Sequence, residues 1–135
     1  MTTHKCRTYF RIIGNFNVQD ILDMLNIPPS RIIAEGIMLP IAKKPAACSE
    51  IDIGYNDHYL QNINEMIRIT IRDLLPIVDL LIDLKSIHAL EYCLEVVPEI
   101  ASESDDIKPN LSLEPDIIAF LHQTGTIYDL DYYVY

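Results

Sequence analysis

Two repeating patterns of apolar and polar residues divide this chain. In residues 8–13, Thr8, Phe10 and Ile12 fall on one side of an extended backbone, which is the alternation of a half-buried strand. Residues 89–97 alternate in the same way, and they predict a second long strand. Its expected inward side chains are Leu90, Tyr92, Leu94 and Val96, and its outward ones are Glu91, Cys93, Glu95 and Val97. Shorter strands are expected at residues 31–33, 50–55 and 110–114.

Apolar residues at helical spacing mark the regions between these strands. Asn17 can cap a helix over residues 18–26, which ends before the two prolines at 28–29. A longer helical region runs to His88. Its candidate caps are Asn56, Asp57 and Asn62. Because proline cannot donate a backbone hydrogen bond, we expect Pro76 to kink or divide this helix.

The C-terminal segment, residues 115–135, combines a short helix with a strand. Pro115 suits the first helical turn, and Gly125 can take the left-handed conformation that closes a helix. In the strand that follows, Tyr128, Leu130, Tyr132 and Val134 share one face, and Ile127, Asp129, Asp131, Tyr133 and Tyr135 share the other. Since the apolar face needs a cover, we expect this strand in the middle of the sheet or paired on at least one side.

The order of these elements predicts the fold class. It is strand, helix, two strands, long helix, two strands, helix and strand, which does not repeat as strand-helix units. We therefore expect an α+β fold with two layers, in which helices gather on one face of a mostly antiparallel sheet. Residues 1–135 are expected to form a single domain.

Charge narrows the classes of partner. Ten Lys and Arg residues against 20 Asp and Glu residues give a formal net charge of -10. This balance disfavours direct binding to nucleic acid or to an anionic membrane, and it favours a basic partner.

The cysteines indicate a reducing compartment. Cys6, Cys48 and Cys93 are an odd number without CxxC spacing, so neither a disulfide framework nor a zinc site is expected. The most apolar run, residues 74–84, is too short to span a bilayer, and residues 1–14 lack the apolar core of a signal peptide. We expect a cytoplasmic protein without a cofactor, since its four glycines form no phosphate-binding loop.

Several stretches together resemble a known family. They are YFRIIG from Tyr9, ILDMLNIPPSR, Gly36 and LSLEPDIIAFLHQTGTIYDLDYYVY. The chain resembles the uncharacterised bacterial family known as domain of unknown function 4279. The resemblance implies an α+β architecture and brings no catalytic motif. Some members look like neighbours of polymorphic toxins, a position in which an immunity protein would be encoded.

The outward face of the last two long strands is the first candidate for a binding surface. If both strands lie in one sheet, this face is acidic and aromatic, which suits the arginines of a basic partner. Its residues are Glu91, Glu95, Asp129, Asp131, Tyr133 and Tyr135. The alternative is an ordinary solvated sheet face. The acidic loop with Glu103, Asp105 and Asp106 is either a solubilising loop or an arm that enters a basic cleft.

Catalytic readings of the acidic residues are less well supported. Asp129 and Asp131 point the same way on a strand, but a divalent cation needs further oxygen ligands, and none can be identified. Another cluster combines Glu50, Asp52, Asp57 and His58. It could serve general base or metal chemistry, or it could be a strand end and helix cap with solvent-facing groups.

Three hypotheses follow. The first is a non-catalytic immunity protein, monomeric or weakly dimeric, that masks the active site of a basic toxin, and the toxin expected is a nuclease. The second is a small hydrolase or metal-dependent enzyme centred on Asp52, Asp57 and His58. The third is an interaction module that self-associates through exposed tyrosines.

Overall fold

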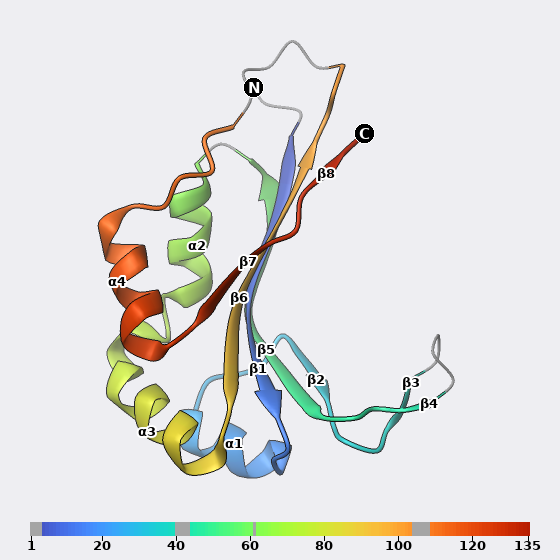
Figure 1. Cartoon of the computed structure of the whole chain (residues 1–135), viewed down its shortest axis with the longest axis vertical. Coiled ribbons are helices and arrows are strands. Elements are labelled where there is room, and N and C mark those ends of the chain that lie inside the picture. The colour runs from blue at the N-terminus through green and yellow to red at the C-terminus, as the bar shows by residue number, and fades with distance from the viewer. Residues whose placement is uncertain (1–3, 40–43, 61, 104–108) are drawn as a thin grey trace.

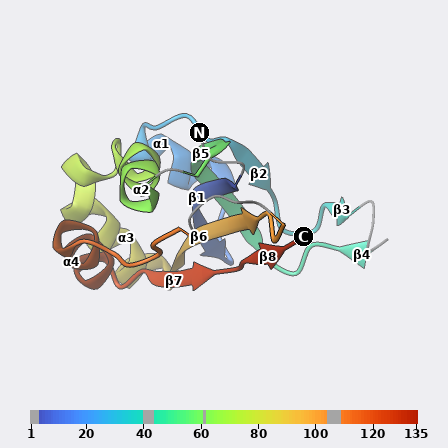
Figure 2. The same cartoon turned by 90° about the horizontal axis from the view of Figure 1, so that it is seen from above.

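The protein has an α+β fold in which helices cover one face of a six-stranded sheet. The computed structural model describes residues 4–39, 44–60, 62–103 and 109–135. The strands are β1 (Lys5–Gly14), β2 (Arg31–Ile33), β3 (Met38–Leu39), β4 (Lys44–Pro45), β5 (Ser49–Tyr59), β6 (Glu91–Ile100), β7 (Ile127–Leu130) and β8 (Tyr133–Val134). The helices are α1 (Val18–Leu25), α2 (Ile63–Ile71), the 3-10 turn η1 (Leu75–Ile77), α3 (Val78–His88) and α4 (Pro115–Thr124). Figures 1 and 2 show α1 to α4 on the same side of the sheet.

Strand β1 is central in the sheet. The order is β2-β5-β1-β6-β7, and β8 also pairs with β6. The pairs β2-β5, β5-β1 and β1-β6 are antiparallel, whereas β7 and β8 run parallel to β6. The predicted fold class, with its mostly antiparallel sheet, is confirmed.

The core lies between the sheet and the helices. Phe10 of β1 is fully buried and packs against Tyr92 of β6, with ring centroids 5.4 Å apart, and against Phe120 of α4 at 6.1 Å. The hydroxyl of Tyr92 donates to the carbonyl of Leu81 in α3 at 2.6 Å. The inward faces predicted for β1 and β6 are therefore correct, because every second side chain of these strands enters one core.

The long helical region is divided as expected, but two of its predicted caps are wrong. Pro76 lies in the turn η1, which separates α2 from α3. The side chain of Asn62 accepts a hydrogen bond from the backbone N–H of Asn64 and caps α2. Asn56 and Asp57 lie within β5 instead, because this strand continues to Tyr59 along β1.

The C-terminal strand lies at the edge of the sheet, not in its middle. It is paired on one side, as expected, and it is split into β7 and β8, both hydrogen-bonded to β6. Helix α4 connects β6 to β7, and this crossover returns the chain parallel to β6. Many side chains of this edge are exposed, including Tyr132, Tyr133 and Tyr135.

Residues 110–114 do not form the predicted strand. Their backbone is held by the side chain of Asn64 in α2, which donates to the carbonyl of Ser112 and accepts from the N–H of Glu114. Leu111 and Leu113 still pack against the core, because the segment passes over it.

Between β2 and β5 the chain forms a small hairpin outside the six-stranded sheet. Strand β3 pairs with β4, and this hairpin lies away from the helices (Figure 1). Among the helices of the described residues, none is both long and apolar enough to cross a membrane.

A bulge in β5 fixes how α2 lies on the sheet. The pairing of β1 with β5 shifts between Thr8 and Phe10, so that Gly54 and Tyr55 both lie opposite one residue of β1. Gly54 has a φ of 68°, and a Cβ atom there would lie 2.1 Å from the carbonyl oxygen of Thr70. The hydroxyl of Thr70 lies 2.6 Å from that of Thr8, and it donates to the carbonyl of Gly54 at 2.8 Å. Helix α2 can approach this closely only because residue 54 has no side chain.

We expect Gly54→Ala to lower the free energy of unfolding by about 3 kcal/mol or more, because the added methyl group meets a backbone atom that cannot move alone. The matched control is Gly36→Ala, since Gly36 also has positive φ but open space around it. There the loss should be about 1 kcal/mol. Urea unfolding measures both values, and equal losses would contradict the close approach of α2.

Candidate functional site

The candidate site lies on the open face, which is the side of the six-stranded sheet turned away from α1 to α4. Along β1, Arg7, Tyr9 and Arg11 alternate with the buried Thr8 and Phe10, so they point to this face. No helix of the described residues covers this face (Figure 2). The open face is therefore the large surface of the sheet that is available for binding.

The β5 bulge brings a second tyrosine to this face. Tyr55 lies beside Tyr9, with ring centroids 6.0 Å apart and planes inclined by 28°. Its backbone N–H donates a hydrogen bond to the hydroxyl of Ser30, which precedes β2, at 3.0 Å. Without the extra residue in β5, Asp52 and Tyr55 would point to opposite faces, because they are three positions apart.

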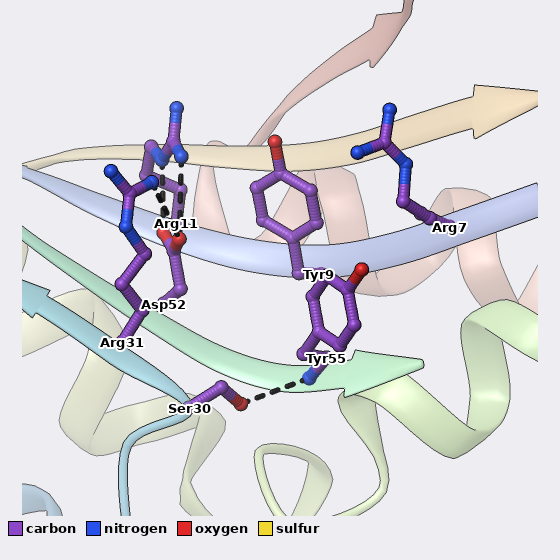
Figure 3. A pocket seen from close by; sticks show the side chains of 7 residues that line it. All are labelled: Arg7, Tyr9, Arg11, Ser30, Arg31, Asp52 and Tyr55. Atoms are coloured by element: carbon purple, nitrogen blue, oxygen red, sulfur yellow. Dashed lines mark hydrogen bonds and ion pairs between the residues drawn. The ribbon is translucent and has the colours of Figure 1, made fainter. Parts of the chain in front are cut away.

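A hollow of about 380 Å³ opens at these tyrosines. Figure 3 shows the guanidinium groups of Arg7 and Arg11 on either side of Tyr9, with Asp52 beside Arg11. The residues that line the hollow are Arg7, Tyr9, Arg11, Ser30, Arg31, Asp52 and Tyr55. Three of the chain's five arginines therefore lie together in a protein of net charge -10.

Arg11 and Asp52 form a hydrogen-bonded ion pair at one end of the hollow. Nε of Arg11 donates to Oδ1 of Asp52 at 2.9 Å, and Nη2 donates to Oδ2 at 3.2 Å. Asp52 is only 5% exposed, so this two-point contact compensates a charge removed from water. The hydrogen bond to Asp52 holds the pKa of Arg11 well above its ordinary value. The guanidinium also lies over the Tyr9 ring, 5.1 Å from its centroid.

Arg7 and Arg31 are paired more loosely. Nη2 of Arg7 lies 3.8 Å from Glu99, and Nη1 of Arg31 lies 3.8 Å from Asp52, which are both longer than a hydrogen bond. Nε of Arg7 is buried and has no hydrogen-bond partner among the described residues. An N–H group in this position retains its capacity to bind an acceptor.

Carboxylates gather on the other side of the open face, which we call the acidic edge and define by Glu95, Glu99, Asp129 and Asp131. Glu95 of β6 lies opposite Asp129 of β7 in the sheet. Burial, together with a hydrogen bond and repulsion from Asp129, raises the pKa of Glu95 to about 7. The hydroxyl of Tyr133 donates to Oδ2 of Asp131 at 3.0 Å, and this hydrogen bond raises the pKa of Tyr133.

The structure brings part of the sequence-predicted acidic surface together. Glu95 and Asp129 are neighbours, and Asp131 contacts Tyr133. Glu91 is exposed on the same strand as Glu95, but it lies four residues before Glu95 in the chain. Tyr135 and Glu103 are exposed, and Asp105 and Asp106 lie outside the described residues.

The residues of the hydrolase hypothesis do not converge. Asp52 is bound to Arg11, and Asp57 and His58 are consecutive residues of β5, so their side chains leave opposite faces. Among the described residues, no group of three His, Cys, Asp or Glu side chains is arranged to hold a metal ion. Cys93 lies on the open-face side of β6 but is only 7% exposed, and burial raises the pKa of its thiol to about 11.

The arginine and tyrosine hollow is not among the sites predicted from the sequence. The alternation of residues 8–13 already places Tyr9 and Arg11 on the outward face of β1, and this was an available signal. The bulge that brings Tyr55 beside Tyr9, and the pairing of β2 that adds Arg31, depend on tertiary contacts.

We expect Arg11→Met to lower the free energy of unfolding by about 3 kcal/mol, because it leaves Asp52 buried without its hydrogen-bonded partner. Arg31→Met is the matched control, since Arg31 contacts the same carboxylate at 3.8 Å and its side chain is 58% exposed. Its loss should be below about 1 kcal/mol. Equal losses in urea unfolding would show that Asp52 does not depend on Arg11.

The raised pKa of Glu95 predicts a pH-dependent stability. The carboxyl group of Glu95 stays protonated to about pH 7 in the folded protein, whereas in the unfolded chain it ionises near pH 4.5. The contribution of Glu95 to stability is therefore fully present below pH 4.5 and is lost as the pH rises to about 7. The fall should reach at most about 3 kcal/mol, and Glu95→Gln should abolish it. Unfolding free energies from pH 4 to 8 measure this effect. Glu91→Gln, on the same strand but exposed, should keep the wild-type profile, and a shared profile of both variants would refute the assignment.

One of the comparisons with known proteins covers nearly the whole chain, and it gives no activity. No curated protein and no solved structure matches this chain. A family model matches residues 4–135, and its family is described as a domain of unknown function. The chain therefore belongs to the DUF4279 family.

Proposed function

We propose that this protein is a non-catalytic immunity protein of the bacterial cytoplasm, which binds a basic toxin, such as a nuclease, and blocks its active site. The observation that carries the proposal is the acidic edge on a sheet face that no described helix covers. Carboxylates of this edge lie beside exposed aromatic side chains, the combination that favours contact with arginine-rich surfaces.

The protonation of Glu95 supports a cationic partner. Its carboxyl group is held partly neutral near pH 7 by burial and by Asp129. A lysine or arginine placed against the acidic edge would lower the pKa of Glu95, since a nearby opposite charge stabilises the ionised form. The stabilisation of Glu95 would then add to the binding free energy.

The overall charge supports rapid capture. A net charge of -10 accelerates encounter with a basic protein at low ionic strength, and an inhibitor of a toxin benefits from a high association rate. In the described residues, the alternative catalytic cluster at Asp52, Asp57 and His58 is separated over two faces of β5.

The first experiment retrieves the partner with the tagged full chain from its native host at low salt and identifies it by mass spectrometry. The retained protein is then expressed alone and together with the immunity candidate. The proposal expects a basic protein that stops growth when expressed alone and is neutralised in co-expression. A retained protein without toxicity, or toxicity that persists in co-expression, would refute it.

The acidic edge is tested with Asp129→Asn/Asp131→Asn in the same assay. Both side chains are exposed, so the fold should persist, and we expect affinity for the retained toxin to fall at least about tenfold. The charge-matched control is Asp79→Asn/Asp83→Asn, which removes two exposed carboxylates from α3. If both double variants bind alike, the interface lies elsewhere, and the exposed Glu103 is the next position to test.

A further inference from the structure

We infer that the hollow between Arg7 and Arg11 is a binding site for a small molecule that carries a phosphate or carboxylate group on a flat, uncharged body. This inference goes beyond the proposed function, because the ligand is a small molecule and its site lies outside the acidic edge.

The first reason is the loosely paired Arg7. Its ion pair with Glu99 spans 3.8 Å, which is longer than a hydrogen bond, and both side chains are more than one third exposed. Nε of Arg7 is buried and also has no hydrogen-bond partner among the described residues. The terminal N–H groups of Arg7 can therefore turn to an oxyanion in the hollow without breaking a hydrogen bond that the structure shows.

The second reason is the local charge. Among the residues that line the hollow, Arg7, Arg11 and Arg31 face one carboxylate, that of Asp52. Asp52 is bound at two points by Arg11. Four more carboxylates surround the hollow without lining it. Glu50 lies 3.6 Å from Arg11 and Glu99 lies 3.8 Å from Arg7, which are both too long for a hydrogen bond. Asp57 and Glu95 lie opposite Arg7 and Tyr9 in the sheet. Arg7 and the partly exposed Arg31 therefore retain donors for a bound anion.

The third reason is the shape between the charges. Arg7 and Arg11 are four residues apart on β1, which separates their backbones by about 13 Å. Tyr9 lies between them, and the ring of Tyr55, which is 51% exposed, lies beside it (Figure 3). A volume of about 380 Å³ suits a small ligand, and tyrosine rings bind flat groups by stacking.

Phosphate and carboxylate are distinguished by titrating the full chain with AMP and, separately, with benzoate in calorimetry at low ionic strength. AMP carries a phosphate on a flat body, and benzoate carries a carboxylate. Adenosine has the flat body without the anion, and it should bind at least about tenfold more weakly than AMP. Saturable binding of AMP identifies the ligand as a phosphate ester, and saturable binding of benzoate alone identifies it as a carboxylate.

Two variants connect the binding to Arg7. Arg7→Met removes the charge, and Arg7→Lys keeps the charge but removes the planar guanidinium group, so both should weaken binding of the ligand about tenfold or more. Arg72→Met is the control, because Arg72 is exposed and is not one of the residues that line the hollow. Circular dichroism confirms that each variant is folded.

The outcomes that overturn the inference are specific. They are the absence of saturable binding of AMP and benzoate at millimolar concentration, equal binding of adenosine and AMP, or unchanged binding in both Arg7 variants. None of these results affects the immunity proposal, because that assay reports neutralisation of a toxin through Asp129 and Asp131.

Discussion

The contact between Thr70 and the β5 bulge is the constraint on which the rest of the structure depends. The hydroxyl group of Thr70 joins α2 to β1 through Thr8 and to β5 through Gly54. It lies in the interior, where Thr8 and Thr70 are buried, so each polar atom needs a partner. The bulge therefore cannot slide along β5 without leaving these groups unpaired.

The bulge then determines which side chains reach the open face. On the N-terminal side of the bulge, Ile51 and Ile53 enter the core and Asp52 points outward. Beyond it the alternation is shifted by one residue, so Tyr55 and Asp57 point outward too. An uninterrupted strand would have sent Tyr55 toward the helices. The pairing of Tyr55 with Tyr9 is thus a consequence of the way α2 packs.

Charges of both signs share the open face but are separated by strand. Arginines follow β1 and β2, whereas the acidic edge follows β6 to β8. The two regions adjoin, because Tyr9 lies opposite Glu95 between β1 and β6. Their electrostatics differ in kind. Asp52 accepts two hydrogen bonds from Arg11, while Glu95 faces a second carboxylate, which raises the pKa of Glu95. One sheet face thus carries an arginine-lined hollow and, next to it, a cluster of carboxylates.

The two layers of this protein follow from local sequence, since alternation in β1 and β6 and helical spacing in α2 and α3 are consequences of side-chain geometry. The division at Pro76 and the closing of α4 at Gly125 are local as well, because these residues act on their own backbone. The remaining features depend on tertiary contacts. The extent of β5, the bulge at Gly54, the edge position of β7 and the extended path of residues 110–114 all depend on partners distant in sequence, such as Thr70 and Asn64. The candidate hollow belongs to this second group, because its arginines and tyrosines come from three strands and their register is set by pairing, not by local preference.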